Sequence, residues 1–246
     1  MVVSDPAVDE PGRDERMIAM PGEPQDAGKA DKPRGRFTIV YLIHEAFRRD
    51  LGRLSASVRA SGVDASRANR LRAHWQFVGD QLHHHHQVED ESLWPLVRPK
   101  LKGRAAQLAV LDEMEAEHLA LQPRCQAVED AFAAYSKEHS TPLGIELGDH
   151  LDALGSELGA HLTAEETDCF PVIDEALTVE EFESFGKATA KAVGMRGSAR
   201  FFPWIFDGAD PTERTAVLSM PPPPVRVLCK LAWEPRYQRQ VATLWS

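Results

Sequence analysis

Two segments of the chain repeat one pattern of histidine, glutamate and proline. One reads His85-His-Gln-Val-Glu89 and the other reads His161-Leu-Thr-Ala-Glu165, and in each a proline follows ten residues after the histidine. On a helix, residues i and i+4 lie on the same face, so each segment would present an imidazole and a carboxylate in the same direction. Both groups are metal ligands, and each pair is therefore half of a predicted metal site.

Apolar residues spaced three or four positions apart predict the helices that would carry these pairs. Three helices are expected near residues 37–58, 64–95 and 104–137, the last with a kink at Pro123, and a fourth begins at Thr141 and contains the second segment. Each helix places at least one residue of ligand type in its apolar seam. These residues are His44, His85, Glu89, His118, His161 and Glu165.

Burial of these polar groups has to be compensated. A buried polar side chain without a partner costs roughly 1–3 kcal/mol, and the stability of a whole domain is only about 5–15 kcal/mol. Mutual hydrogen bonds could satisfy some of the groups, whereas bound metal would satisfy all of them. Four imidazoles and two carboxylates exceed the ligands of a structural zinc site and include no thiolate. The predicted cofactor is a pair of non-haem iron ions with an oxo or hydroxo bridge, because two octahedral ions would use the whole set.

The predicted fold class is all-α, an up-down four-helix bundle with an additional short-helix C-terminal extension. Residues 1–35 are expected to form a disordered acidic, proline-rich tail, residues 36–176 the bundle, and residues 177–246 a helical extension packed on the bundle. In the extension, Thr178-Val-Glu-Glu181 is a capping box that begins a helix expected to end at Gly194. An aromatic cluster is expected to pack against the bundle. It consists of Phe201, Phe202, Trp204 and Phe206.

Composition restricts the class of protein. With 38 acidic and 28 basic residues the net charge is -10, which disfavours binding to nucleic acid or to an anionic membrane. The three cysteines contain no CxxC motif and indicate neither a disulfide scaffold nor a zinc ribbon. No apolar run reaches the roughly 18 residues of a membrane span. We expect a cytoplasmic, soluble protein, and the sequence indicates no particular protein partner.

The candidate ligands and their neighbours resemble those of the hemerythrin-like, HHE cation-binding domains of bacteria. The resemblance spans about Phe37 to Glu175, and the proline-rich, tryptophan-containing extension is similar to that of actinobacterial members. It implies an up-down bundle around a non-haem di-iron centre, with the four seam histidines as terminal ligands and the two seam glutamates as bridges. The segments that carry it are His44, His85-x-x-x-Glu89, Glu117-His118 and His161-x-x-x-Glu165-Glu166, with Leu-Trp-Pro and Cys-Phe-Pro after the two pairs.

One position departs from the pattern of oxygen-carrying members. These have a further histidine four residues after the one in the third helix, where this chain has Gln122. An iron left open or completed by water would weaken the case for oxygen transport. The leading hypothesis is a di-iron protein that binds or senses O2, NO or peroxide. The alternatives are a catalase-like or peroxidase-like oxidoreductase and an interaction bundle in which the metal is only a structural staple.

The remaining helical histidines are expected to lie outside the centre. His86 and Asp90 also have the i, i+4 spacing, but they would point about 100° away from the seam. His83 and His84 are expected on the flank of the seam or beside the ligands. His74 and His150 each lie three turns before a predicted ligand, where exposure to solvent is expected, with a second polar layer between the two helices as the alternative.

Overall fold

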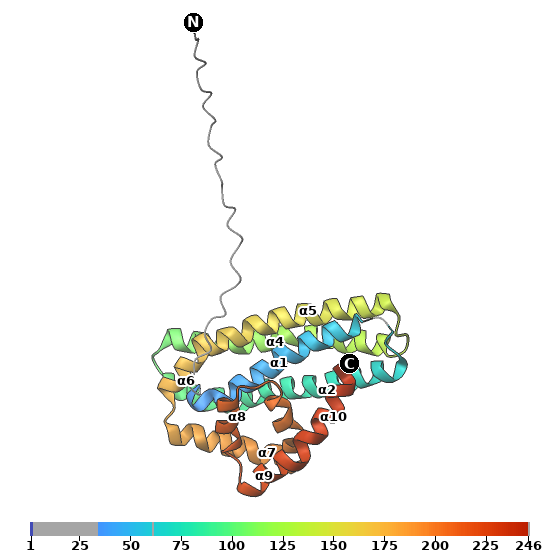
Figure 1. Cartoon of the computed structure of the whole chain (residues 1–246). Coiled ribbons are helices and arrows are strands. Elements are labelled where there is room, and N and C mark those ends of the chain that lie inside the picture. The colour runs from blue at the N-terminus through green and yellow to red at the C-terminus, as the bar shows by residue number, and fades with distance from the viewer. Residues whose placement is uncertain (2–33, 61, 246) are drawn as a thin grey trace. The chain divides into compact units, whose positions relative to one another are not determined.

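The computed structural model describes Met1 and residues 34–60 and 62–245, so the predicted tail lies almost entirely outside the described residues. Four long helices lie side by side (Figure 1) and contact one another in the order α1, α2, α4, α5 and back to α1. Every regular element in the described part of the chain is helical, which confirms the all-α fold class. The bundle helices are α1 Thr38–Val58, α2 Ala65–Val88, α4 Ala105–Tyr135 and α5 Thr141–Ala164.

The connections from α1 to α2 and from α4 to α5 are short. Gly62 adopts φ 75° between α1 and α2, a left-handed conformation that favours glycine. The Asp64 side chain then caps α2 by accepting a hydrogen bond from the Arg67 N–H. Pro142 lies in the first turn of α5, where its missing N–H costs nothing. α4 remains helical through Pro123.

Each repeated segment contains one turn of π-helix that begins at its glutamate. The first π-turn, Glu89–Leu93, leads into α3 (Trp94–Val97) and a 3-10 turn (Arg98–Leu101), and the second, Glu165–Cys169, leads into α6 (Phe170–Ala176). The Trp94 N–H donates to the Glu89 carbonyl and the Phe170 N–H to the Glu165 carbonyl, both five residues back. The proline after each of these residues has no backbone N–H. An α-helical turn would therefore already lack one hydrogen bond here, and the wider π-turn gives up fewer bonds. Such π-turns occur frequently at functional sites.

The apolar interior is divided into two clusters by a polar layer. Along α1, Phe37 at the entrance belongs to the smaller cluster, whereas Phe47 belongs to the larger one. Along α4 the order is Met114 and then Leu121, with His118 between them. The candidate ligands therefore occupy a single level of the bundle, with close-packed hydrophobic residues on both sides.

The C-terminal elements pack on the side of the bundle formed by α1 and α2. α7 and α8 contact α1, and α10 contacts α2. Thr178 and Glu181 form the predicted capping box, and the first helical segment of α7 ends at Gly194 as expected, where the backbone leaves the helical conformation with φ 63° and ψ -178°; a second helical segment begins directly beyond it. The elements are α7 Val179–Phe206, α8 Pro211–Leu218, α9 Pro223–Leu228, a π-turn Cys229–Trp233 and α10 Glu234–Trp245.

A buried carboxylate joins the C-terminal elements to the bundle. Asp50 of α1 is fully buried. Its Oδ2 accepts hydrogen bonds from the Trp204 indole N–H of α7 at 2.9 Å and from His74 Nε2 of α2 at 2.7 Å, and its Oδ1 accepts one from Arg49 Nε at 2.7 Å. The expectation that His74 is exposed was wrong, because its partner on α1 could not be identified from the periodicity of α2.

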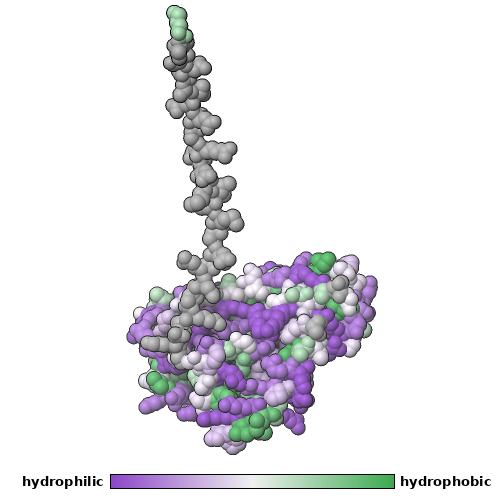
Figure 2. Space-filling model, viewed as in Figure 1, coloured by the Kyte–Doolittle hydropathy of each residue, from purple (hydrophilic) through white to green (hydrophobic). Residues whose placement is uncertain are grey.

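Outside the core, the visible face of the described part is mainly hydrophilic with scattered hydrophobic side chains (Figure 2). One hydrophobic patch lies in the region of α9 and the π-turn after it. Among the described helices none is long and apolar enough to cross a membrane. The exposed hydrophobic residues of the patch region include Val227, Leu228 and Leu231.

Candidate metal centre

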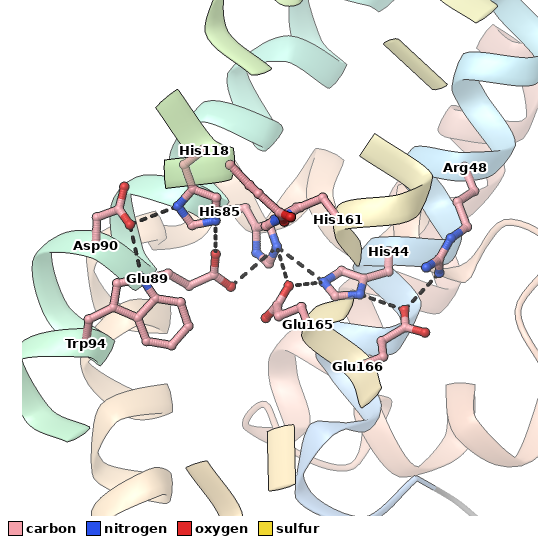
Figure 3. A network of polar contacts seen from close by, with 11 residues as sticks. His44, Arg48, His85, Glu89, Asp90, Trp94, His118, His161, Glu165 and Glu166 are labelled. Carbon is pink, nitrogen blue, oxygen red and sulfur yellow. Dashed lines mark hydrogen bonds and ion pairs between the residues drawn. The ribbon is translucent and has the colours of Figure 1, made fainter. Parts of the chain in front are cut away.

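The polar layer brings all six sequence-predicted ligand residues together in the interior of the bundle (Figure 3). Histidines arrive from α1, α2, α4 and α5, and the two glutamates come from the π-turns that follow α2 and α5. The imidazole and carboxylate atoms form two groups, each with ligand atoms within 4.8 Å of one another. The groups are His44, His85 and Glu165, and His86, His118 and His161.

The first group is centred on the Glu165 carboxylate. Glu165 Oε2 lies 3.2 Å from His44 Nε2 and 3.8 Å from His85 Nε2. The two histidine Nε2 atoms lie 3.3 Å apart. Glu89 Oε1 approaches the same group at 3.4 Å from His85 Nε2. Two imidazoles and two carboxylates therefore converge on one small volume.

The second group contains a histidine that the sequence analysis placed outside the centre. The His86 ring stacks on the His118 ring with centroids 4.0 Å apart and planes 10° apart, and it meets the His161 ring edge-on at 5.4 Å. The expectation that His86 points away with Asp90 was wrong. A bundle-facing stripe on a helix is at least about 100° wide, so two consecutive residues can both reach the interior, one toward each neighbouring helix.

Glu89 connects the two groups. Its Oε1 faces His85 of the first group, and its Oε2 lies 3.6 Å from His118 Nε2 of the second. A carboxylate with one oxygen directed at each group has the geometry of a bridging ligand. Glu89 is the first residue of the π-turn, so it lies where the backbone hydrogen bonds change from the α-helical to the π-helical pattern.

Several ligand-type atoms in this layer are buried without a satisfactory hydrogen bond to any described residue. Leaving such a group unpaired costs about 1–3 kcal/mol, and more for a charge. Bound cations would satisfy the lone pairs of the imidazole nitrogens and of the carboxylate oxygens together, so the residues present fit a metal centre. The atoms are Nε2 of His86, His118 and His161, Oε2 of Glu89, and both carboxylate oxygens of Glu165.

The electrostatics of the layer favour neutral imidazoles at most positions. Burial lowers the pKa of His85 to about 3 and also lowers the pKa values of His86 and His118. Neutral imidazole has a free lone pair for metal. At His44, burial acts to lower the pKa, but Glu165 and Glu166 more than offset it, and the net shift is upward. Burial and the nearby Glu165 raise the pKa of Glu89, which is the consequence of two carboxylates sharing one site.

Three outer carboxylates orient three of the histidines. Asp90 Oδ1 lies 2.8 Å from His118 Nδ1, Glu117 Oε2 lies 2.7 Å from His161 Nδ1, and Glu166 Oε1 lies 2.8 Å from His44 Nδ1. Each carboxylate is adjacent in sequence to a ligand-type residue and reaches the histidine of a neighbouring helix. With Nδ1–H donated to a carboxylate, Nε2 keeps its lone pair for metal.

Two of these carboxylates have further donors. Trp94 Nε1 donates to Asp90 Oδ1 at 3.1 Å, and Arg48 Nη1 donates to Glu166 Oε1 at 2.8 Å. Trp94 thus holds the carboxylate that orients His118, and Arg48 holds the carboxylate that orients His44 (Figure 3). The sequence contained a signal for this arrangement, because Asp90 and Glu166 each follow a repeated glutamate directly. Their contacts across helices could not be inferred from that spacing.

The centre is approached from two sides of different character. A mostly apolar cavity between the bundle and α7 reaches His85, Glu89 and Glu165. A more polar groove between α2 and α4 reaches His86 and His118, and Gln122 lines it. Cys169 is buried beside the layer, and burial raises the pKa of its thiol. A low-pKa, reactive thiol is therefore not indicated at this position.

Comparison with known proteins agrees with this geometry. The family model described as Hemerythrin HHE cation binding domain matches residues 37–173, a range that begins just before α1 and ends in α6. No curated protein and no solved structure gave a match. The matched range contains every residue of the polar layer and covers more than half of the chain, and on these grounds the chain belongs to the hemerythrin HHE cation-binding domain family.

Proposed function

We propose that this protein holds two non-haem iron ions and uses them to bind or sense a small oxidant or diatomic ligand, O2, NO or peroxide. The observation that carries the proposal is the convergence of buried, unsatisfied imidazole and carboxylate atoms in two adjacent groups. When bound, the iron pair would supply a redox-active Lewis acid for such a ligand. His44 and His85 would hold one ion, His86, His118 and His161 the other, and Glu89 and Glu165 would bridge them.

The ligand count supports binding of one exogenous molecule. Two octahedral ions offer about twelve positions. Five imidazoles and two bridging carboxylates occupy nine of them, and the proposed oxo or hydroxo bridge takes two more, which leaves about one. His86 matters here because α4 has Gln122 where oxygen-carrying relatives have a second histidine. With His86 from α2 as the fifth imidazole, the argument from Gln122 against oxygen transport would no longer hold.

Metal content and optical spectra test this proposal. Purified protein expressed with adequate iron should contain about two irons per chain and absorb in the near-ultraviolet through charge transfer from the bridging oxygen. Addition of peroxide or NO should change that absorption reversibly. Protein that carries zinc but no iron after growth with limited zinc and adequate iron would contradict the proposal and favour the structural staple, which would not respond to oxidant.

Peroxide decomposition is a second candidate, supported by the polar groove that reaches His86 and His118. A polar route suits water and peroxide better than an apolar one does. Turnover should exceed that of free iron and should be lost in His118→Ala and Glu165→Ala, whereas Glu91→Gln, at an exposed site next to Asp90, should retain it. Wild-type turnover equal to that of free iron would dismiss this candidate and leave ligand binding.

A cytoplasmic location and the division into a bundle, residues 36–176, and an extension, residues 177–246, also remain proposals. The three free cysteines agree with a reducing compartment. Cell fractionation of a tagged chain tests the first. Limited proteolysis between α6 and α7 tests the second: release of a folded, iron-containing bundle would support it, and loss of iron upon cleavage would indicate one cooperative unit.

A further inference from the structure

A cavity of about 210 Å³ between the bundle and α7 extends from the metal centre. The end at the centre includes His85, Glu89 and Glu165, and the remaining wall is mostly apolar and comes mainly from α1, α2, α6 and both segments of α7. The interruption at Gly194 lets the two segments of α7 line the same cavity. Because α7 lies outside the range matched by the family, this wall is an addition to the family domain.

The cavity is larger than the ligands of the proposed function require. A water molecule takes about 30 Å³ in the liquid, and a dry apolar cavity of about 150 Å³ in another protein binds benzene. A space of 210 Å³ is therefore suited to a substituted aromatic ring or to a chain of about eight carbons. Apolar walls also bind water poorly, so an apolar occupant would gain free energy by filling the space.

One polar atom in the wall indicates a polar group on the occupant. His84 lines the cavity, and its Nε2 is buried without a hydrogen-bond partner among the described residues. An unpaired buried nitrogen costs about 1–3 kcal/mol, and a hydroxyl or carbonyl on the ligand would remove that cost. His84 precedes His85 on α2, and both line the cavity, so this hydrogen bond would form at the end near the centre.

We propose that the cavity binds an amphiphilic organic molecule with an apolar body of about eight carbons and one hydrogen-bonding group. The polar group bonds His84 Nε2 at the end near the metal centre, and the body lies along α7. This inference goes beyond the proposed function: binding depends on the cavity wall and on His84, and the occupant is an organic molecule rather than a diatomic or peroxide.

Calorimetric titration of the metal-loaded protein with 1-octanol tests the proposal. We expect one molecule to bind per chain. 1,8-Octanediol has the same length but would bury its second hydroxyl against the apolar wall, so it should bind at least about tenfold more weakly. Absence of octanol binding, or equal affinity for the two alcohols, would overturn the proposal. Octanol should also shift the absorption of the iron centre, and saturation without any shift would overturn the placement of its polar end.

Matched variants of α7 locate the site. Ala188 and Ala190 are both exposed, but only Ala190 of the two lines the cavity. Ala190→Trp should reduce octanol affinity at least about tenfold by filling space, and Ala188→Trp should leave it unchanged. Since Ala190 is exposed, the larger side chain displaces no buried core residue and this variant should fold. His84→Phe keeps the apolar volume but removes the nitrogen, and it should weaken octanol binding about fivefold or more.

Iron content, measured separately on every variant, distinguishes failure of this inference from failure of the proposed function. Octanol binding by a protein that holds no iron would contradict the di-iron proposal alone. Two irons together with no octanol binding would contradict the cavity proposal alone. Equal octanol affinity in Ala190→Trp and Ala188→Trp would place any observed binding elsewhere on the protein and would also overturn the cavity proposal.

Discussion

The rings of His86 on α2 and His118 on α4 stack at a centroid distance of 4.0 Å. Two stacked imidazolium ions would repel each other, and burial lowers the pKa values of both residues so that both are neutral near pH 7. Both rings are neutral and have a buried, unsatisfied Nε2, and their ligand atoms lie within 4.8 Å of one another; a rotation of the stacked rings would direct both lone pairs at one cation. This contact makes His86 a ligand candidate, although its position next to His85 gave no such indication.

Replacement of His86 by alanine should selectively weaken one half of the centre. We expect His86→Ala to bind about one iron per chain in place of about two, because the other group retains His44, His85 and both carboxylates. Metal analysis after gel filtration measures this directly. His83→Ala alters an exposed histidine in the same run and should retain the wild-type iron content. Equal iron content in both variants would remove His86 from the ligand set.

The contrast between predicted and missed ligands has a physical cause. Periodicity identifies the middle of a buried helical stripe, and His44, His85, His118 and His161 all lie there. His86 lies at the edge of the stripe, where burial depends on which helix packs beside it. The π-turn at Glu89 is likewise a tertiary feature, since no local pattern except the proline that follows distinguishes it from an ordinary turn.

The hydrogen bond from His118 Nδ1 to Asp90 should control metal affinity without contributing a ligand. Asp90→Asn keeps the shape but loses the charge that holds the Nδ1 proton, and we expect about a 10–100-fold loss of affinity at the second group. Glu91→Gln is the matched control, because Glu91 is exposed and its carboxylate accepts a hydrogen bond from Gln87 and not from a histidine of the layer. Competition with a chelator compares the three proteins. Similar chelator resistance in Asp90→Asn and Glu91→Gln would refute the orienting role.

Trp204 and Asp50 should couple the stability of the extension to that of the bundle. Trp204→Phe removes the indole N–H that bonds the buried carboxylate, and about 1.5–3 kcal/mol of unfolding free energy should be lost beyond the cost of the smaller ring. A double-mutant cycle with Asp50→Asn, followed by urea denaturation, isolates the pair. A coupling energy below about 0.5 kcal/mol would mean that the two residues act independently.

The buried carboxylate of Asp50 should also make the stability of the protein depend on pH. Burial acts to raise the pKa of Asp50, but His74 and Arg49 outweigh it, and the folded-state pKa lies below the ordinary value of 3.8. A depressed folded-state pKa stabilises the protein fully above the unfolded-state pKa, about 3.9, and this contribution is lost as pH falls through the folded-state value. The stability difference between wild type and Asp50→Asn, in the same metal state, should shrink below about pH 4. A constant difference between pH 6 and pH 3 would contradict this assignment.

The close approach of α5 to α1 can be tested with two glycines of the same helix. A Cβ added at Gly144 would lie 2.3 Å from the Val58 carbonyl oxygen, a backbone atom that also accepts the Tyr135 hydroxyl, whereas a Cβ at Gly159 would meet nothing within 4 Å. Gly144→Ala should therefore destabilise the protein by about 1–3 kcal/mol through forced separation of the helices. Gly159→Ala should stabilise it by about 0.5–1 kcal/mol through helix propensity alone. The unfolding temperatures of the two variants should thus move in opposite directions from that of wild type, and a shared direction would contradict the close packing of α5 on α1.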